Sequence, residues 1–498
     1  MGYISFPDQG QTTAVFEEQV SKVMTGLSRL GVGEADAVLL LLRNDSAFLQ
    51  AATAISRLGA SPVPLNWHCT TDELKLIIKN AGARLAIVHD DLAHLHAQAW
   101  PPALTLVGVD SADVCVFEPA LRWSRLLADC PAYDGQRVAQ RGALIYTSGT
   151  TSAPKAIDRE ALLDERLSAM MESQRRTYGF RSGMRALICG PLYHSMSMSY
   201  ANTALATMGA DGALFVEIRF DAQRVLELIQ TQHITHLLMV PVMFVRLLRL
   251  DQSQRRSVDL SSIECVTHSA APCAPDIKRA MIDWWGPVLQ EFYGASETGP
   301  VTMITSQEYL QRPGSVGRPL PDCRVAVLDE YGEPLPAGHT GEIAVRNKNY
   351  PDFTYRNLPA ERAALDRAGL IATGDIGQLD PAGYLFLLDR KKDMVITGGV
   401  NVYPSEIEGI LLNNTAVRDC AVFGIPDAEY GESLAAHIEP VPGAALDERS
   451  VIEFLKARLP SFKVPKLVRF GTLPRDDNGK IAKRCIADAY WEGAGRRI

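Results

Sequence analysis

The segment 146–156, YTSGTTSAPKA, concentrates side chains that can bind phosphate. It carries Lys155 and a run of hydroxyl and glycine residues: Thr147, Ser148, Gly149, Thr150 and Thr151. The apolar residues 143–146 indicate the end of a buried strand. A strand that opens into such a loop presents backbone N–H groups, hydroxyl donors and a positive charge to a polyphosphate. A Ser/Thr-rich surface turn remains the alternative.

A second segment, 290–299, offers different chemistry. Tyr293 provides a flat ring that can stack on adenine, and Gly294 allows a substrate to approach the backbone. Glu297 provides a hard oxygen ligand for Mg²⁺. The alternative for Glu297 is a carboxylate at the start of a helix, where the helix dipole stabilises it.

Other segments are ambiguous when each is taken alone. His194 follows a predicted strand and could be a base, a substrate contact or a structural histidine. The sequence TGD at 373–375 also caps ordinary turns, and Lys480 could be any surface lysine. The charged run 389–393 could be an ordinary solvated face of the protein. The glycines at 398–399 could form a plain turn.

In order along the chain, these segments resemble the motifs of the adenylate-forming enzymes. That family comprises acyl- and aryl-CoA synthetases, peptide-synthetase adenylation domains and firefly luciferase, and the chain is most similar to bacterial acyl- or aryl-CoA synthetases. YTSGTTSAPKA resembles [YF]TSGTTGxPKG, with Ser152 and Ala156 in place of two glycines. HSAAP at 268–272 partly resembles SGAAP, YGASE at 293–297 resembles YGxTE, and the segment 398–408 resembles GGxNxxPxEIE. The motifs span essentially the whole chain.

The resemblance implies a role for each motif residue. The implied catalytic residues are Lys480, Glu297 and Lys155, with Glu297 also the Mg²⁺ ligand. The implied nucleotide and CoA contacts are Thr147, Ser148, Gly149, Thr150, Thr151, Ala271, Pro272, Tyr293, Gly294, Ala295, Ser296, Asp375, Arg390, Gly398 and Gly399. The acid pocket would contain His194, Met198, Met243, Phe244 and Gly299, and Lys392 would be the hinge.

The implied activity is an ATP-dependent ligase that uses Mg²⁺ and coenzyme A. A carboxylate would first form acyl-AMP, and a thiol would then take the acyl group. Two alternatives remain: an acyl-AMP ligase that loads a carrier protein in trans, and a nucleotide-binding protein without turnover. The second alternative is suggested only by Ser152 and Ala156.

Two segments that the resemblance places at the acid, 192–203 and 240–245, contain no Asp, Glu, Lys or Arg. Their methionines and aromatic residues predict a flexible apolar pocket, which disfavours amino acids and dicarboxylates as substrates. Whether the acid is fatty, aromatic or polycyclic stays open.

Composition excludes several classes of protein. The chain has 498 residues and a net charge of −8, which gives no basic footprint for nucleic acid. Its nine cysteines are scattered singly, without the spacing of a zinc site or a disulfide framework. No signal peptide and no apolar run of about 18–20 residues is visible. We expect a cytoplasmic monomer or homodimer without integral membrane association.

The elements that must position these residues follow an alternating pattern. Predicted helices at 14–30, 46–58 and 71–80 alternate with apolar strands at 37–42, 59–65 and 85–88, which predicts doubly wound α/β layers. Residues 90–140 are only weakly periodic and are taken as a lead-in. The runs 325–328 and 342–345 predict a small antiparallel β-region. The resemblance divides the chain into an N-terminal domain, 1–389, and a small mobile α+β domain, 390–498.

Overall fold

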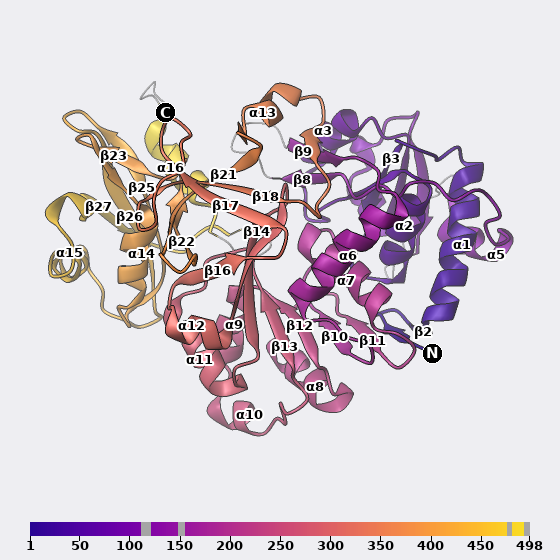
Figure 1. Ribbon diagram of the computed structural model, residues 1–498, viewed down its shortest axis with the longest axis horizontal. Coiled ribbons are helices and arrows are strands. Elements are labelled where there is room, and N and C mark those ends of the chain that lie inside the picture. Colours follow the sequence, from indigo (N-terminus) through magenta and orange to yellow (C-terminus); the bar gives the residue numbers. More distant parts are fainter. Residues whose placement is uncertain (111–120, 148–154, 476–480, 493–498) are drawn as a thin grey trace.

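The computed structural model describes residues 1–110, 121–147, 155–475 and 481–492. It has a mixed α/β architecture in which a large N-terminal part and a smaller C-terminal part occupy opposite ends of the longest axis (Figure 1). The predicted fold class is confirmed. Over the described ranges, no helix combines the length and hydropathy needed to cross a membrane.

A parallel sheet forms the first layer, in the order β4-β3-β5-β6-β7. Strand β3 (Ala37–Leu41) is buried at every position, as expected for a parallel strand covered on both faces. The other strands of this sheet are β4 (Ser61–Pro64), β5 (Leu85–His89), β6 (Thr105–Val109) and β7 (Leu121–Arg122). The accompanying helices are α1 (Thr13–Arg29), α2 (Ser46–Arg57), α3 (Thr71–Ala81), α4 (Asp90–Leu95), η1 (Ala97–Ala99) and α5 (Trp123–Asp129).

One expectation in this region was wrong. Residues 90–140 are more than a lead-in, since β6 pairs in parallel with β5 from Leu85↔Thr105 to His89↔Val109.

Helix α3 is capped by Thr70. The Thr70 side chain accepts from the N–H of Glu73, whose carboxylate in turn accepts from the N–H of Thr70.

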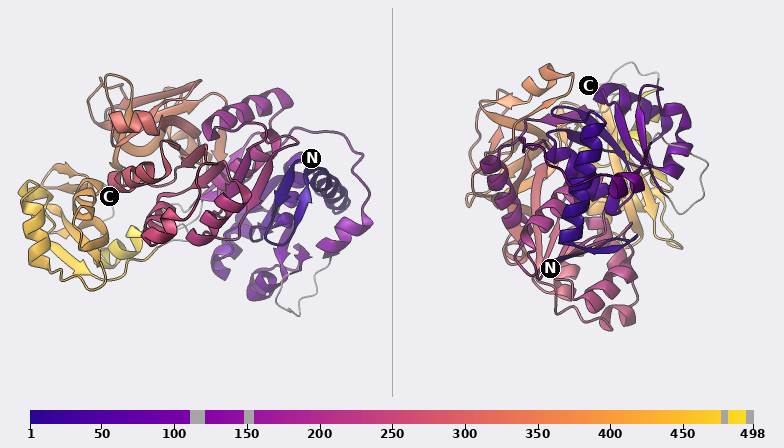
Figure 2. Two further views of the ribbon diagram at one scale, coloured as in Figure 1. Left: turned by 90° about the horizontal axis from the view of Figure 1, so that it is seen from below. Right: turned by 90° about the vertical axis from the view of Figure 1, so that its right-hand side faces the viewer.

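A larger sheet runs through the middle of the molecule. Its parallel portion contains β1 (Tyr3–Ser5), β10 (Arg185–Ile188), β11 (Ala213–Val216), β12 (His236–Met239), β13 (Cys265–His268) and β14 (Leu289–Ala295), with β2 (Gly10–Thr12) antiparallel at the edge. The helices of this region are α6 (Asp164–Tyr178), α7 (Ser195–Thr207), α8 (Ala222–Gln232), α9 (Pro241–Leu248), α10 (Gln252–Arg256) and α11 (Pro275–Trp285). Helices α6 and α7 lie side by side next to α2 (Figures 1 and 2).

The same sheet continues as antiparallel strands beyond β14. These are β15 (Gly299–Thr305), β16 (Ser315–Pro319), β22 (Leu385–Arg390), β21 (Leu370–Leu379), β18 (Gly341–Asn347) and β17 (Cys323–Leu328), with β20 (Asp366–Arg367) beside β21. The predicted β-region is confirmed, because Val325 pairs with Val345 and Leu328 with Glu342. Helix α12 (Ser306–Gln311) follows β15. A separate small sheet joins β8 (Ile145–Thr147), β9 (Lys155–Arg159) and β19 (Phe353–Tyr355), and α13 (Pro359–Ala363) follows β19.

The C-terminal part has its own sheet and core. The sheet contains β23 (Val395–Thr397), β24 (Val400–Val402), β25 (Val417–Asp427), β26 (Gly431–Pro440) and β27 (Leu467–Phe470), with α14 (Pro404–Leu412), α15 (Glu448–Lys456), η2 (Ser461–Lys463) and α16 (Lys483–Trp491). Its core includes the fully buried Val402, Ile407 and Leu411. Strand β22 belongs to the large sheet and β23 to this one, so the chain passes between the two at residues 391–394.

Candidate active site

A cleft of 3390 Å³ lies where the strand ends of the large sheet meet the C-terminal part. Most of the residues predicted from the motifs line it, although they come from segments far apart in the sequence. They are Lys155, Met198, Ala271, Pro272, Tyr293, Gly294, Ala295, Ser296, Glu297, Gly299, Asp375, Arg390 and Lys392.

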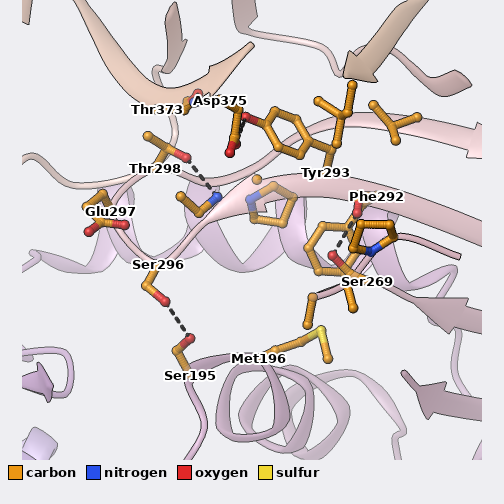
Figure 3. A pocket seen from close by; sticks show the side chains of 18 of the residues that line it. Ser195, Met196, Ser269, Phe292, Tyr293, Ser296, Glu297, Thr298, Thr373 and Asp375 are labelled. Atoms are coloured by element: carbon orange, nitrogen blue, oxygen red, sulfur yellow. Dashed lines mark hydrogen bonds between the residues drawn. The ribbon is translucent and has the colours of Figure 1, made fainter. Parts of the chain in front are cut away.

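Tyr293, Asp375 and Arg390 form a polar triad on one wall of this cleft. The Tyr293 hydroxyl donates to Asp375 Oδ2 at 2.5 Å (Figure 3). Arg390 Nε lies 2.7 Å from Asp375 Oδ1. Pairing of β21 with β22 places Asp375 opposite Arg390. Burial and the neighbouring Asp375 carboxylate raise the pKa of Tyr293 well above its usual 10, so its hydroxyl stays protonated and donates.

Glu297 and Lys155 are held by a segment that no motif marks. Tyr355, at the end of β19, donates its hydroxyl to Glu297 Oε1 at 2.9 Å. Lys155 pairs with Glu361 on α13, and its ammonium group lies 5.4 Å from the centre of the Tyr355 ring. Strand β19 pairs with β9, which fixes Tyr355 opposite Ile157 and close to both charged residues.

The loop that carries Glu297 is fastened by further hydrogen bonds. Thr298 Oγ1 accepts from the N–H of Ala295 at 3.2 Å, and the hydroxyls of Ser195 and Ser296 lie 3.2 Å apart (Figure 3). Arg159 donates to the carbonyl oxygens of Ser296 and Glu297. The sequence reasoning missed Arg159, although Lys155, Ile157 and Arg159 alternate on one strand.

Two glycines are required by close contacts in the loop. A Cβ on Gly294 would lie 2.1 Å from the carbonyl oxygen of Gly299. Gly299 itself has φ +66°, and a Cβ there would lie 2.5 Å from the Tyr350 ring. Any side chain at either position would therefore displace the strand turn that carries Glu297.

Three predicted pocket residues do not line the cleft. Phe244 is fully buried, and both it and Met243 point from α9 into the hydrophobic core. The Phe244 ring lies 5.2 Å from that of His268. Their neighbours Val242 and Val245 line the cleft instead. His194 precedes α7 and packs its ring 4.4 Å from that of Tyr193, whereas the next residues, Ser195 and Met196, line the cleft.

Part of the predicted phosphate site lies outside the described residues: Ser148, Gly149, Thr150 and Thr151, together with Ser152 and Lys480. Thr147 ends β8 and is paired with Lys155 of β9. Ala156, which replaces a family glycine, is 1% exposed and packs in the core under β9. Its methyl group therefore fits the fold.

The segment after Arg390 forms a turn between the two sheets. Lys392 is exposed in this turn, and Asp389 Oδ2 just before it accepts from the N–H of Ser405 at 2.9 Å. Gly398 and Gly399 form the exposed turn between β23 and β24, with φ of +57° and +80°. They do not line the cleft, whereas Arg475 and Ile481, the described residues nearest to Lys480 on either side, do.

The donor set fits a magnesium ion that is held mainly by substrate. Among the described residues there is no cluster of three or more His, Cys, Asp or Glu side chains that could hold a metal alone. Mg²⁺ is commonly bound by one or two carboxylates together with phosphate oxygens and water. Glu297 presents one carboxylate on the cleft wall, close to Lys155 through their shared neighbour Tyr355.

Comparison with known proteins establishes the family. The profile of the AMP-binding enzymes matches residues 3–350, and that of the AMP-binding enzyme C-terminal domain matches residues 406–480. The chain belongs to this family. The resemblance seen in the motifs is thus confirmed, and so is the predicted enzyme class, an AMP-forming acid–thiol ligase.

Curated relatives cover nearly the whole chain. It is 34% identical over 519 residues to a medium/long-chain-fatty-acid–CoA ligase of Mycobacterium tuberculosis, covering 99% of this chain and 88% of the relative. It is 30% identical to a feruloyl-CoA synthase of Amycolatopsis sp., covering 95% and 92%. A fatty acid–[acyl-carrier-protein] ligase of Streptomyces coeruleorubidus is 28% identical, with 96% and 91% covered.

A solved structure shows the same fold. ATP-bound MatB from Rhodopseudomonas palustris superposes with a TM-score of 0.86 at 27% identity, and the match covers 99% of this chain and 96% of that one.

Proposed function

We propose that this protein is an ATP-dependent ligase that joins an apolar carboxylic acid to the thiol of coenzyme A. The observation that carries the proposal is the convergence of Tyr293, Asp375, Arg390, Glu297 and Lys155 on one cleft. These are the groups that ribose, phosphate and a magnesium ion require, and they come from the motif segments of the AMP-binding enzymes.

In the first half-reaction the acid carboxylate attacks the α-phosphate of ATP. The bond from that phosphorus to the bridging oxygen breaks, and pyrophosphate leaves. Asp375, held by Tyr293 and Arg390, is oriented to accept hydrogen bonds from the ribose hydroxyls. Lys155 supplies positive charge to the phosphates, and Lys480 is proposed to add a second lysine at the carboxylate. Such fixed charges stabilise the negative charge that spreads over the transferring group.

Glu297 is the proposed ligand for Mg²⁺. When bound, Mg²⁺ neutralises phosphate charge and orients the leaving pyrophosphate. The hydrogen bond from Tyr355 fixes one carboxylate oxygen of Glu297, and Arg159 fixes the backbone of the same residue. The carboxylate is therefore held in place before substrate arrives.

In the second half-reaction the thiol attacks the acyl carbon and AMP leaves. We propose that the C-terminal domain, 390–498, turns about Lys392 to bring Gly398 and Gly399 to the cleft. The turn that contains these glycines is exposed, and Tyr430 lies beside it with 43% of its surface exposed. The Lys466 ammonium group lies 4.4 Å from the centre of the Tyr430 ring. The nearby lysines Lys463 and Lys466 support CoA binding less, because they already pair with Glu406 and Asp427.

An apolar acid is favoured by the side chains on the pocket side of the cleft. Met196 and Met198 of α7 line it, as do Met170 and Met171 of α6. Arg175 also lines it, but its guanidinium already pairs with the carboxylate of Glu172. Nε and Nη2 of Arg175 donate to the two Glu172 oxygens at 2.6 and 2.8 Å. No charged partner stands ready for a second carboxylate among these residues of α6 and α7 that the structure describes.

The test is pyrophosphate release from ATP with a panel of acids, with and without CoA, and mass spectrometry of the products. Turnover with apolar acids that yields acyl-CoA is the expected result. Glu297→Gln should reduce the rate at least 100-fold. Glu165→Gln is the control, because it removes the same charge from an exposed side chain of α6, and it should leave the rate unchanged.

Two other outcomes would change the conclusion. Acyl-AMP that forms but reacts only with a phosphopantetheinylated carrier protein would make this a carrier-protein ligase, the activity of one relative. No pyrophosphate release with any acid would favour a nucleotide-binding protein without turnover.

A further inference from the structure

The cleft extends well beyond the groups needed for adenylation. From Ser195 it continues along α7 as a stripe that recurs every three or four residues and includes Met196, Ser199, Asn202, Leu205 and Ala206. The opposite wall is α6, again along one face: Leu167, Met170, Met171, Gln174 and Tyr178. With 13 residues at a rise of 1.5 Å each, α7 gives this groove a length of about 20 Å.

The outer end of the groove reaches the first layer of the protein. There it is lined by Ala52 and Thr53 of α2 and by Phe16 of α1. An ion pair between Arg57 and Glu17 stands at this end, with Arg57 Nη2 3.0 Å from Glu17 Oε1. The pair is partly exposed, so the outer end opens toward solvent.

Two hydrogen bonds join α6 to α7 near the middle of α7. Thr203 donates to the Gln174 amide oxygen at 2.9 Å, and Tyr178 donates to Ser199 Oγ at 3.1 Å. The lining along the rest of these two helices is amphipathic, with methionine, leucine and alanine side chains beside polar ones such as Ser168 and Asn202. Its apolar part offers soft surface to a ligand.

Three apolar residues of α6, unlike Tyr178 on the same helix, are not part of the core. The buried residues of this helix are only Gln174, Thr177 and Tyr178. None of the core clusters formed by the described residues includes Leu167, Met170 or Met171, yet all three line the groove. A partly exposed apolar strip that continues an active-site cleft is typical of a ligand-binding groove.

We propose that this groove binds the acyl tail of the substrate, and that the substrate class is a long, linear carboxylic acid whose tail runs outward between α6 and α7 toward α2. This inference rests on the proposed function and adds the substrate to it. A tail in this groove would be bound by soft, unbranched side chains, which accept flexible chains without imposing one shape. A compact aromatic acid would fill only the inner end.

The first experiment compares a filled groove with an intact one. Ala206 is exposed on the cleft face of α7, and Ala206→Trp places an indole across the groove. We expect kcat/KM for hexadecanoate to fall at least 20-fold, while that for butanoate or phenylacetate changes less than twofold. Ala169→Trp, the same substitution at an exposed position of α6 that does not line the cleft, is the matched control and should change neither.

A second readout does not depend on turnover. A long-chain acid with a photoreactive diazirine at its terminal carbon should crosslink to peptides of α6, the end of α7 or residues 52–57, as identified by mass spectrometry. Crosslinks confined to α9, whose residues Val242, Val245, Arg246 and Arg249 line another arm of the cleft, would overturn the proposal.

The outcomes separate this inference from the function on which it rests. A wild-type enzyme that activates short acids but not long ones, or an Ala206→Trp variant that loses both equally, would leave the ligase in place and refute the groove. If no acid releases pyrophosphate, the ligase proposal fails. The crosslink then decides alone whether the groove holds an acyl tail.

Discussion

The ion pair between Lys155 and Glu361 leads to a prediction that distinguishes the nucleotide site from an ordinary surface. In this structure the proposed phosphate-binding lysine is engaged by a carboxylate from α13. ATP phosphates must replace that carboxylate in order to reach Lys155. Replacing Glu361 with glutamine removes the competing charge and leaves the side-chain size unchanged, so ATP should bind more tightly.

The size of the effect follows from the exposure of the pair. The side chains of Lys155 and Glu361 are 22% and 38% exposed, so solvent screens their attraction. Ion pairs of this kind contribute about 0.5–1 kcal/mol. At about 1.4 kcal/mol for each factor of ten, Glu361→Gln should lower the Kd for ATP about two- to fivefold. The Tyr355 ring 5.4 Å from Lys155 remains to orient the ammonium group.

Isothermal titration calorimetry with ATP and Mg²⁺, without acid, measures this change directly. The gain should shrink when salt rises from about 0.05 M to about 0.5 M, since screening weakens the pair in the wild type. Glu165→Gln, which alters net charge equally without touching Lys155, is the control. An unchanged or weaker affinity for ATP in Glu361→Gln would refute the reasoning.

Three further variants test the site and its support. Tyr355→Phe removes the hydroxyl that holds Glu297, so the Mg²⁺ concentration for half-maximal pyrophosphate release should rise about fivefold, for a hydrogen bond of about 1 kcal/mol; an unchanged Mg²⁺ requirement would contradict this role. Asp375→Asn should raise KM for ATP at least tenfold without lowering the thermal midpoint, whereas an equal loss with every substrate and a lower midpoint would indicate misfolding. Lys278→Met leaves the carboxylate of Glu291 buried without its cation and should cost about 3–5 kcal/mol in urea denaturation. Burial raises the pKa of Glu291 above its ordinary 4.5, so above that pH the folded variant binds more protons than the unfolded chain. The free energy of unfolding of the variant should therefore fall as pH rises from about 4.5 toward neutral. A loss of stability that does not vary with pH would argue against a buried charge as its cause.

The sequence predicted residues that line the cleft but not how they are joined. Asp375 and Arg390 were assigned from two separate motifs, and only the antiparallel pairing of β21 with β22 shows that they form one ion pair. A motif identifies a side chain type at a position. It carries no information about register, which depends on turns and partners elsewhere in the chain.

Apolar residues were harder to assign than polar ones. Phe244 and Val245 are equally apolar neighbours on α9, yet one lies in the core and the other lines the cleft. Which face of a helix meets a cavity depends on how the helix packs, and hydrophobicity alone does not determine it. For the same reason no pattern in the sequence indicated that Met170 of α6 lines the cleft.

Tyr355 and Glu361 were missed because no motif contains them. They reach the site through the pairing of β19 with β9, between segments about two hundred residues apart in the chain. Their interactions, a hydrogen bond from a tyrosine to a carboxylate and an ion pair between a carboxylate and a lysine, are ordinary for a surface loop. Only their position next to Glu297 and Lys155 connects them with the reaction.

The cleft wall proposed to bind the nucleotide is supported by a charged pair in the protein interior. Lys278 Nζ lies 2.5 Å from Glu291 Oε2, and His268 Nε2 lies 3.9 Å from the same oxygen. Burial and the nearby lysine keep the pKa of His268 well below 6.5, so this imidazole is neutral and adds no second cation. The pair joins α11, which follows Ala271 and Pro272, to β14, which carries Tyr293. Since breaking a buried pair leaves a charge unsatisfied, the two walls of the proposed adenine site cannot separate without a large cost in free energy. The same pair that stabilises the fold therefore also fixes the distance across the proposed nucleotide site.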